Sequence, residues 1–335
     1  MWSGLSRTYW ELFASRAAVG IGEAAYATIA PALLADYYPP SRRGRIFAIF
    51  YMAIPVGAAL GYVVGGLVSQ AWGWRAAFFV AGIPGLLLAL WVLWVPDPPR
   101  GASEPPGVSI TSRAEQAAER PGVLLALRRT ASLYLLLMRQ ASYALTVLGY
   151  AAYTFAVGGL AFWMPTFLER VRAVPVRQAT TGFGAIVVVT GFLGTFAGGW
   201  LGDYCLRYTR QAYLWVSGIA TVLALPLVTI CLTSAAPSVF YPTLVVAELL
   251  LFMSTGPINS VIVALVSPAH RASAVALSVL AIHLLGDVIS PPLIGSVSDH
   301  TSLGDGVLLV PVAVAVSGLL WVAAALRCRK EGVAA

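Results

Sequence analysis

The sequence predicts an all-α polytopic membrane protein, and three observations lead to this fold class. Of the 335 residues, 59% are hydrophobic and 10% are charged, against roughly 25% charged residues in soluble domains. The mean hydropathy is +0.81. Nine apolar runs each approach the ~20 residues that a helix needs to cross the hydrocarbon core of a bilayer. Together these observations exclude a soluble globular domain.

The nine runs fall into three before a long polar segment and six after it. They lie at residues 9–36, 46–70, 76–96, 142–168, 183–203, 213–235, 240–266, 272–296 and 307–326. The intervening segment is rich in Pro, Gly, Ser and charge, as linkers are. We therefore expect an incomplete N-terminal bundle of three spans (1–96), a cytoplasmic linker (97–135), and a C-terminal six-helix bundle with a cytoplasmic tail (136–335).

Basic residues mark one side of this topology, as the positive-inside rule describes for cytoplasmic loops. They lie at Arg42, Arg43 and Arg45, in the 97–141 segment, and at Arg207, Arg210, Arg271, Arg327, Arg329 and Lys330. Arg170, Arg172 and Arg177 form one exception on the opposite side. The pattern predicts a multi-pass protein with a cytoplasmic C-terminus, in the inner (plasma) membrane if the source is bacterial. An odd number of spans then leaves Met1 outside.

The net charge of +7 arises from these short turns and tails, so it does not indicate a nucleic-acid partner. The three cysteines are far apart and have no metal-binding spacing. The sequence contains no nucleophile, zinc or phosphate-binding motif in a suitable context. We therefore expect no enzyme activity, no catalytic residue, no metal and no cofactor.

The first apolar run carries two ionised side chains, Arg16 and Glu23. Seven residues separate them, so both lie on one helix face, about 10 Å apart along the axis. A carboxylate near the middle of a bilayer is costly and must face a partner or a wet cavity. The alternatives are that Arg16 snorkels to the interface and that Glu23 forms a static ion pair with Arg16.

Other polar side chains lie in the later spans. His283 and Asp287 are four residues apart on one face, where the imidazole could sense pH and the carboxylate could orient it. Asp287 could instead bond backbone groups freed by Pro291 and Pro292. Further candidates for lining a cavity are Asn259, Glu248, Tyr150, Tyr153, Phe155 and Trp163. For the aromatic residues, packing and interfacial anchoring are equally open.

An internal repeat relates the two sides of the linker. Pro40-Ser-Arg-Arg43 opens the second span, with Ala48 five residues after Arg43. Pro268-Ala-His-Arg271 opens the eighth span, with Ala276 five residues after Arg271. A constant offset is typical of parallel repeats in two-bundle transporters, although turns between spans are often rich in Pro and Arg in any case.

Six strings resemble the Spinster family of the major facilitator superfamily: RAAVGIGEAAY (16–26), FYMAIPVGAALGYVVGG (50–66), FWMPTFLER (162–170), GTFAGGWLGD (194–203), FMSTGPIN (252–259) and IHLLGDVISPPLIG (282–295). The resemblance covers nearly the whole chain. It implies a fold of twelve helices in two six-helix bundles, with a substrate site between them. Here about nine helices are expected, because the N-terminal stretch resembles the end of the family's third helix. The expectation is that the true start lies upstream of Met1.

The resemblance also assigns roles to residues. Arg16 and Glu23 match family positions for head-group binding and proton coupling, and His283 would line the cavity and sense protons. Gly199, Asp203 and Arg207 resemble a GxxxDxxxR gating loop, in which Asp203 could cap a neighbouring helix and release it on opening. Ordinary capping without gating is the alternative. Gly57, Gly61, Gly65 and Gly66 resemble an antiporter motif, but Tyr62 replaces its proline and weakens that inference.

The expected function is secondary active transport by rocker-switch alternating access, coupled to protons. The resemblance implies an amphiphilic lipid-like substrate, a lysophospholipid or sphingoid phosphate. Substrate binding would involve Arg16, Glu23, Tyr150, Tyr153, Asn259 and His283, and proton coupling would involve Glu23, His283 and Asp287. The expected partners are membrane lipids, the substrate and protons, and the expected state is a monomer. The alternative is a truncated, non-transporting remnant that acts as an interaction subunit or has no function.

Overall fold

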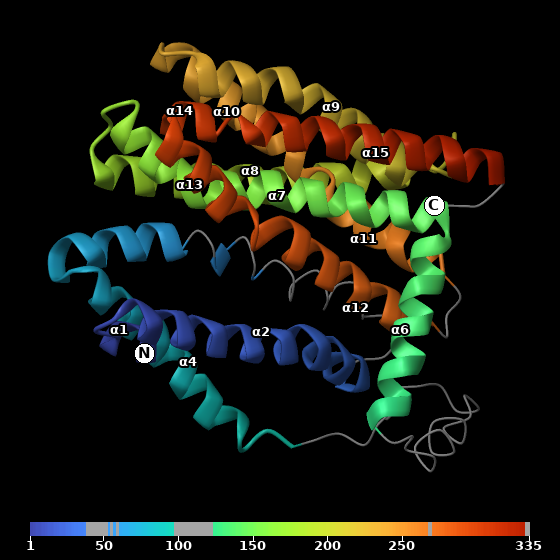
Figure 1. Ribbon diagram of the computed structural model, residues 1–335, viewed down its shortest axis with the longest axis horizontal. Coiled ribbons are helices and arrows are strands. Elements are labelled where there is room, and N and C mark those ends of the chain that lie inside the picture. Colours follow the sequence, from blue (N-terminus) through green and yellow to red (C-terminus); the bar gives the residue numbers. More distant parts are fainter. Residues whose placement is uncertain (38–52, 54–55, 58–59, 97–122, 267–269, 332–335) are drawn as a thin grey trace. The chain divides into compact units, whose positions relative to one another are not determined.

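The computed structural model describes residues 1–37, 53, 56–57, 60–96, 123–266 and 270–331 (Figure 1). Within these residues all regular elements are helices. The chain divides into two compact units, Met1–Arg120 and Pro121–Ala335. The all-α polytopic fold class is confirmed.

The first unit contains four described helical stretches. They are α1 (Trp2–Leu5), α2 (Tyr9–Tyr37), residues 60–72, and α4 (Trp74–Val92). Gly73 separates the last two with φ of 81°, a left-handed conformation that glycine adopts without steric cost. The short α1 packs on α4 so closely that a Cβ on Gly4 would lie 2.8 Å from the Phe79 ring. The hydroxyl of Ser15 in α2 donates to the Ser3 hydroxyl at 2.9 Å.

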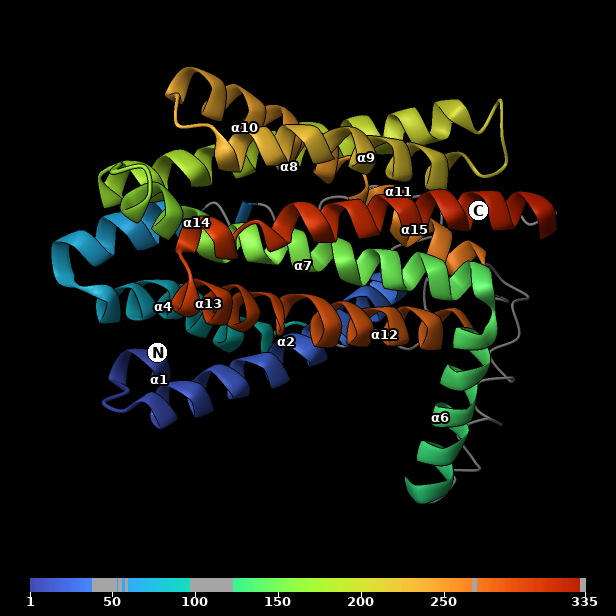
Figure 2. The same cartoon turned by 45° about the horizontal axis from the view of Figure 1, so that its top comes forward.

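The second unit is a helical bundle (Figures 1 and 2). Its helices are α6 (Val123–Arg139), α7 (Ala141–Arg170), α8 (Val176–Cys205), α9 (Ala212–Thr233), α10 (Pro237–Phe252), α11 (Thr255–Ala264), α12 (Arg271–Ile282), the π-helical turn η2 (His283–Asp287), α13 (Ser290–His300), α14 (Leu303–Gly306) and α15 (Leu309–Glu331). α15 packs between α7 and α9, and α10 packs on α8 and α9. In both views α6 runs at a steep angle across the start of α7.

Glycines permit the closest helix approaches in this unit, as small residues commonly do in membrane bundles. A Cβ on Gly198 of α8 would lie 1.9 Å from the carbonyl oxygen of Met253, at the end of α10. A Cβ on Gly218 of α9 would lie 3.1 Å from the backbone nitrogen of Val322 in α15. The backbones of α8 and α10, and those of α9 and α15, therefore approach each other closely.

Seven helical segments of the described part are long and apolar enough to cross a membrane: 74–92, 141–170, 176–205, 212–233, 237–262, 273–300 and 303–331. They match seven of the nine predicted spans. The predicted 9–36 span is α2, a helix of 29 residues. The 46–70 span lies partly outside the described residues, as do Pro40–Arg43 and Pro268 of the repeat.

The predicted linker, residues 97–135, includes a helix. Residues 97–122 lie outside the described part, residues 123–139 form α6, and the second unit begins at Pro121. The helix forms because an apolar stripe that includes Tyr134, Leu137 and Met138 packs toward the bundle, whereas Arg128 and Arg129 remain exposed. At the α6–α7 junction, the Gln140 side chain donates to the Leu265 carbonyl at 3.2 Å.

The structure explains one of the three basic residues on the predicted outer side, Arg172. Arg172, just after α7, donates from Nη2 to the Leu232 carbonyl near the end of α9 at 2.9 Å. Its guanidinium carbon lies 5.1 Å from the Phe167 ring centroid and 5.8 Å from that of Phe240. A cation at a helix C-terminus and over aromatic faces is stabilised there. Arg172 therefore has a packing role that the positive-inside rule does not consider.

Candidate functional site

In the first unit, α2 presents Arg16 and Glu23 on its exposed surface. The guanidinium carbon of Arg16 lies 5.8 Å from the centroid of the Phe78 ring in α4. Among the described residues, no ion pair joins Arg16 to Glu23. The static ion pair between these two residues is therefore not what the structure contains, and both charged groups are exposed within their unit.

In the second unit, the π-helical turn η2 contains both His283 and Asp287. The imidazole Nδ1 and the carboxylate Oδ2 are 3.0 Å apart, and the two side chains are 53% and 40% exposed. Single π-helical turns inside membrane helices frequently mark functional sites, because they change which groups the helix presents. The predicted His283–Asp287 pair is thus present, with the carboxylate placed to orient the ring.

The π-helical turn is held by α7. The Thr154 hydroxyl lies 3.2 Å from the Ile282 carbonyl, directly before the turn, and shares its one proton with the Tyr150 and Ala151 carbonyls of its own helix at 3.1 and 3.0 Å. A Cβ on Gly286 would lie 2.2 Å from the Thr154 Oγ1 and 2.9 Å from the Ala151 carbonyl oxygen. Only glycine therefore permits this approach of η2 to α7. Thr154 and Gly286 could not be identified from the sequence, because their roles depend on contacts between distant segments.

The Asp287 side chain does not bond to backbone groups freed by Pro291 and Pro292, which was the alternative role for this residue. Its Oδ2 pairs with His283, and its Oδ1 lies 2.9 Å from the position that a Cβ on Gly158 would occupy. The carbonyl of Pro291 accepts a hydrogen bond from the Trp163 indole at 3.1 Å. Trp163 therefore links α7 to the start of α13.

The predicted aromatic lining is largely buried. Tyr150 and Tyr153 are 8% and 4% exposed, and their ring centroids lie 6.0 Å apart. The exposed Asn259 of α11 donates its amide to the Tyr150 hydroxyl at 3.3 Å. The Tyr153 hydroxyl lies 3.3 Å from that of Thr255. The structure thus brings Tyr150, Tyr153 and Asn259 together, with the two tyrosines packed inside the bundle.

The predicted gating residues lie at the end of α8. Asp203 accepts a hydrogen bond from the Tyr213 hydroxyl at 2.7 Å, so it contacts the beginning of α9 through a side chain and not through the backbone. The Arg207 guanidinium carbon lies 5.4 Å from the Tyr204 ring centroid. Gly199 has open space where a Cβ would lie. Their gating role stays a prediction.

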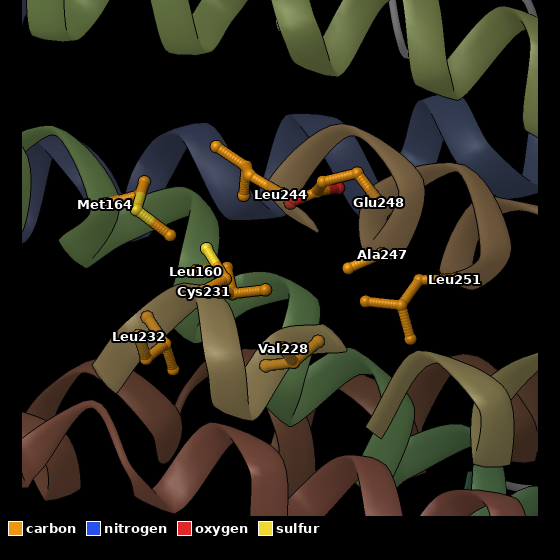
Figure 3. A pocket seen from close by; sticks show the side chains of 9 residues that line it. All are labelled: Leu160, Met164, Val228, Cys231, Leu232, Leu244, Ala247, Glu248 and Leu251. Carbon is orange, nitrogen blue, oxygen red and sulfur yellow. The ribbon is translucent and has the colours of Figure 1, made fainter. Parts of the chain in front are cut away.

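A carboxyl group also lies inside the second unit. Glu248 of α10 is 2% exposed and borders a cavity of about 10 Å³ between α7, α9 and α10. In Figure 3 its oxygens are the only oxygen atoms among the labelled side chains, which otherwise come from Leu160, Met164, Val228, Cys231, Leu232, Leu244, Ala247 and Leu251.

Metal ligands do not gather in the part of the chain that the structure describes: no group of three His, Cys, Asp or Glu side chains could hold an ion there. The three cysteines, Cys205, Cys231 and Cys328, are free thiols.

Comparison with known proteins identifies first the class and then the family. The profile of the Major Facilitator Superfamily matches residues 1–291. The chain is 33% identical to Protein spinster homolog 3 of Danio rerio, over 98% of this chain and 68% of that protein. It is 32% identical to the Sphingosine-1-phosphate transporter SPNS2 of Mus musculus, over 95% of this chain and 60% of that protein. The chain belongs to the Spinster family of major facilitator superfamily proteins.

Solved structures support the fold. The inward-facing, unoccupied crystal structure of a bacterial homolog to the human lysosomal transporter Spinster matches with a TM-score of 0.77 and 23% identity, over 98% of this chain and 80% of that one. A D-xylose-proton symporter matches with a TM-score of 0.65 and 20% identity, over 93% of this chain and 70% of that one. The curated relatives are longer than this chain, which spans 56% of the Bos taurus spinster homolog 1. The mouse SPNS2 relative is named as a transporter, and the two solved structures are of a transporter homolog and a symporter.

Proposed function

We propose that the protein is a secondary active transporter that moves an amphiphile with an anionic or zwitterionic head group, coupled to protons, by rocker-switch alternating access. The substrate class is lysophospholipids or sphingoid phosphates. The names of the mouse, frog and zebrafish relatives, which are sphingosine-1-phosphate transporters, support this class. The observation that carries the proposal is the exposed His283–Asp287 pair on a π-helical turn of a membrane-spanning segment.

Each polar group has a part in the proposed cycle. Arg16 binds the anionic head group, because a guanidinium matches phosphate geometry. Glu23 exchanges a proton as substrate arrives, since a nearby cation favours the ionised carboxylate and an apolar surrounding disfavours it. His283 responds to pH in the physiological range while Asp287 fixes its ring. Asn259 and Tyr150, joined by a hydrogen bond, bind the polar part of the substrate, and Tyr153 lies beside them.

Opening and closing involve the end of α8 in this proposal. The Asp203–Tyr213 hydrogen bond at 2.7 Å breaks when the cavity opens, and Arg207 and Gly199 move with it. We propose that the protein is a monomer. We also propose that its C-terminus is cytoplasmic, because Arg327, Arg329 and Lys330 lie in the last turns of α15.

The test is uptake of a radiolabelled lysophospholipid into vesicles that contain the intact protein and carry a pH gradient. Glu23→Gln is expected to abolish the pH dependence of uptake while expression in the membrane stays intact. Glu169→Gln, at the exposed end of α7, is the matched control and should behave as the wild type. Retained proton coupling in the Glu23→Gln protein would refute the proposed role of Glu23.

A further inference from the structure

Glu248 has no role in the transport cycle proposed above, and its surroundings are unusual for a carboxyl group. It lies within the apolar segment Pro237–Ile262 and is 2% exposed. Among the residues that the structure describes, no side chain or backbone group forms a hydrogen bond or ion pair with its carboxyl group. The side chains around the cavity beside it are aliphatic, apart from the sulfur atoms of Met164 and Cys231 (Figure 3).

The elements packed around Glu248 bring no charge toward it. From α9 the nearby titratable group is the Cys231 thiol, and from α7 it is the Tyr153 hydroxyl. The part of α8 between Gln178 and Gly202 contains no titratable side chain. Arg172 acts electrostatically on Cys231, and its guanidinium is bonded to the Leu232 carbonyl.

The apolar surroundings determine whether the Glu248 carboxyl group is protonated or ionised. Burying an ionised carboxylate without a partner costs far more free energy than burying a neutral carboxylic acid. A cavity of about 10 Å³ is at the lower limit of ~10–15 Å³ for one water molecule. The burial of Glu248 among α7, α9 and α10 therefore favours its protonated form over its ionised form.

We propose that Glu248 is a proton-binding site of the second unit, distinct from Glu23 and from the His283–Asp287 pair. It holds its proton while α9 and α10 are packed together and releases it only when the two helices separate and water reaches the cavity. Protonation of Glu248 and the packing of α10 on α9 are then thermodynamically coupled, because each favours the other. The inference concerns the charge of one group, so it stands whether or not transport is coupled to protons.

Infrared spectroscopy of the intact protein in vesicles tests the proposal directly. At neutral pH the wild type should show the C=O stretching band of a protonated carboxyl group, and Glu248→Gln should lose it. Glu169→Gln should leave the band unchanged, because Glu169 lies exposed at the end of α7 and away from the buried carboxyl group. A spectrum in which Glu248→Gln retains the whole band would overturn the proposal.

Alkylation of Cys231 provides a second measurement that uses the native carboxyl group. In a Cys205→Ala/Cys328→Ala background, the rate of N-ethylmaleimide labelling is compared at each pH between the protein with Glu248 and the protein with Glu248→Gln. The ratio of the two rates should rise with pH, because ionised Glu248 separates α9 from α10 and exposes Cys231. The negative charge of ionised Glu248 disfavours the neighbouring Cys231 thiolate and would lower this ratio, so a rise cannot come from the ionisation of the thiol itself. A ratio that is constant with pH would refute the coupling between proton release and helix separation.

Discussion

Gly198→Ala tests the close approach of α8 to α10. The new Cβ would lie 1.9 Å from the Met253 carbonyl oxygen, 2.5 Å from its carbonyl carbon and 2.6 Å from its Cα. All three atoms belong to the backbone, so a rotation of one side chain cannot relieve the overlap. The oxygen would have to move about 1.5 Å to reach the 3.4 Å of ordinary van der Waals contact.

The neighbouring Gly199 provides a matched control, because no described atom outside its own stretch of helix lies within 4 Å of where its Cβ would be. Both substitutions lie inside the same helix, so both gain the roughly 1 kcal/mol by which alanine favours a helix over glycine. The difference between the two variants therefore isolates the overlap. Overpacking of this kind costs about 1–3 kcal/mol, so Gly198→Ala should be less stable than Gly199→Ala by that amount.

The assay is reversible unfolding in mixed micelles with increasing SDS, followed by circular dichroism, with the free energy of unfolding compared among the wild type and both variants. Gly199→Ala should equal or exceed the wild type. If Gly198→Ala were as stable as Gly199→Ala, α8 and α10 would not pack as closely as the structure shows. The burial of Glu248 on α10 would then also be in doubt.

Three further substitutions test other contacts. Arg172→Gln should lower the free energy of unfolding by about 1–2 kcal/mol, because it removes both the hydrogen bond to α9 and the contact with two aromatic rings; a loss no larger than that of the exposed Arg170→Gln would contradict this. Trp321→Phe should cost about 1–3 kcal/mol, since it leaves the buried Thr146 carbonyl without the indole donor found at 3.1 Å, and an unchanged unfolding transition would contradict that role. Gly286→Ala should destabilise the π-helical turn, and Thr154→Ala in the same chain should partly restore stability, because it removes the atom 2.2 Å away; no recovery in the double variant would argue against the contact.

Much of the architecture was predictable because membrane spans depend on local composition. A run of about 20 apolar residues specifies a helix wherever it occurs in a bilayer, and seven of the predicted runs correspond to membrane-length helices in the described part of the chain. The helix α6 within the predicted linker was not predictable in the same way. α6 is amphipathic and short of apolar residues for a span, so its place in the second unit depends on packing that composition does not express.

The candidate site was also predictable only where it depends on local sequence. The spacing of His283 and Asp287 predicts their pairing, because residues four apart face each other on a helix. The π-helical turn that carries them depends on Thr154, which is more than a hundred residues earlier in the chain, and no local pattern reveals that contact. Likewise the sequence identifies Glu248 as a costly residue in a span, but its complete burial follows from how α7, α9 and α10 meet.

The central claim is that an amphiphile and protons cross the membrane together through this protein. The most direct measurement reconstitutes the intact protein in vesicles containing a pH-sensitive dye and adds a lysophospholipid or a sphingoid phosphate in the absence of a pH gradient. The account predicts a change in luminal pH that follows substrate entry and disappears in Glu23→Gln. Substrate entry without any change in luminal pH, or no entry in vesicles that contain folded protein, would contradict it.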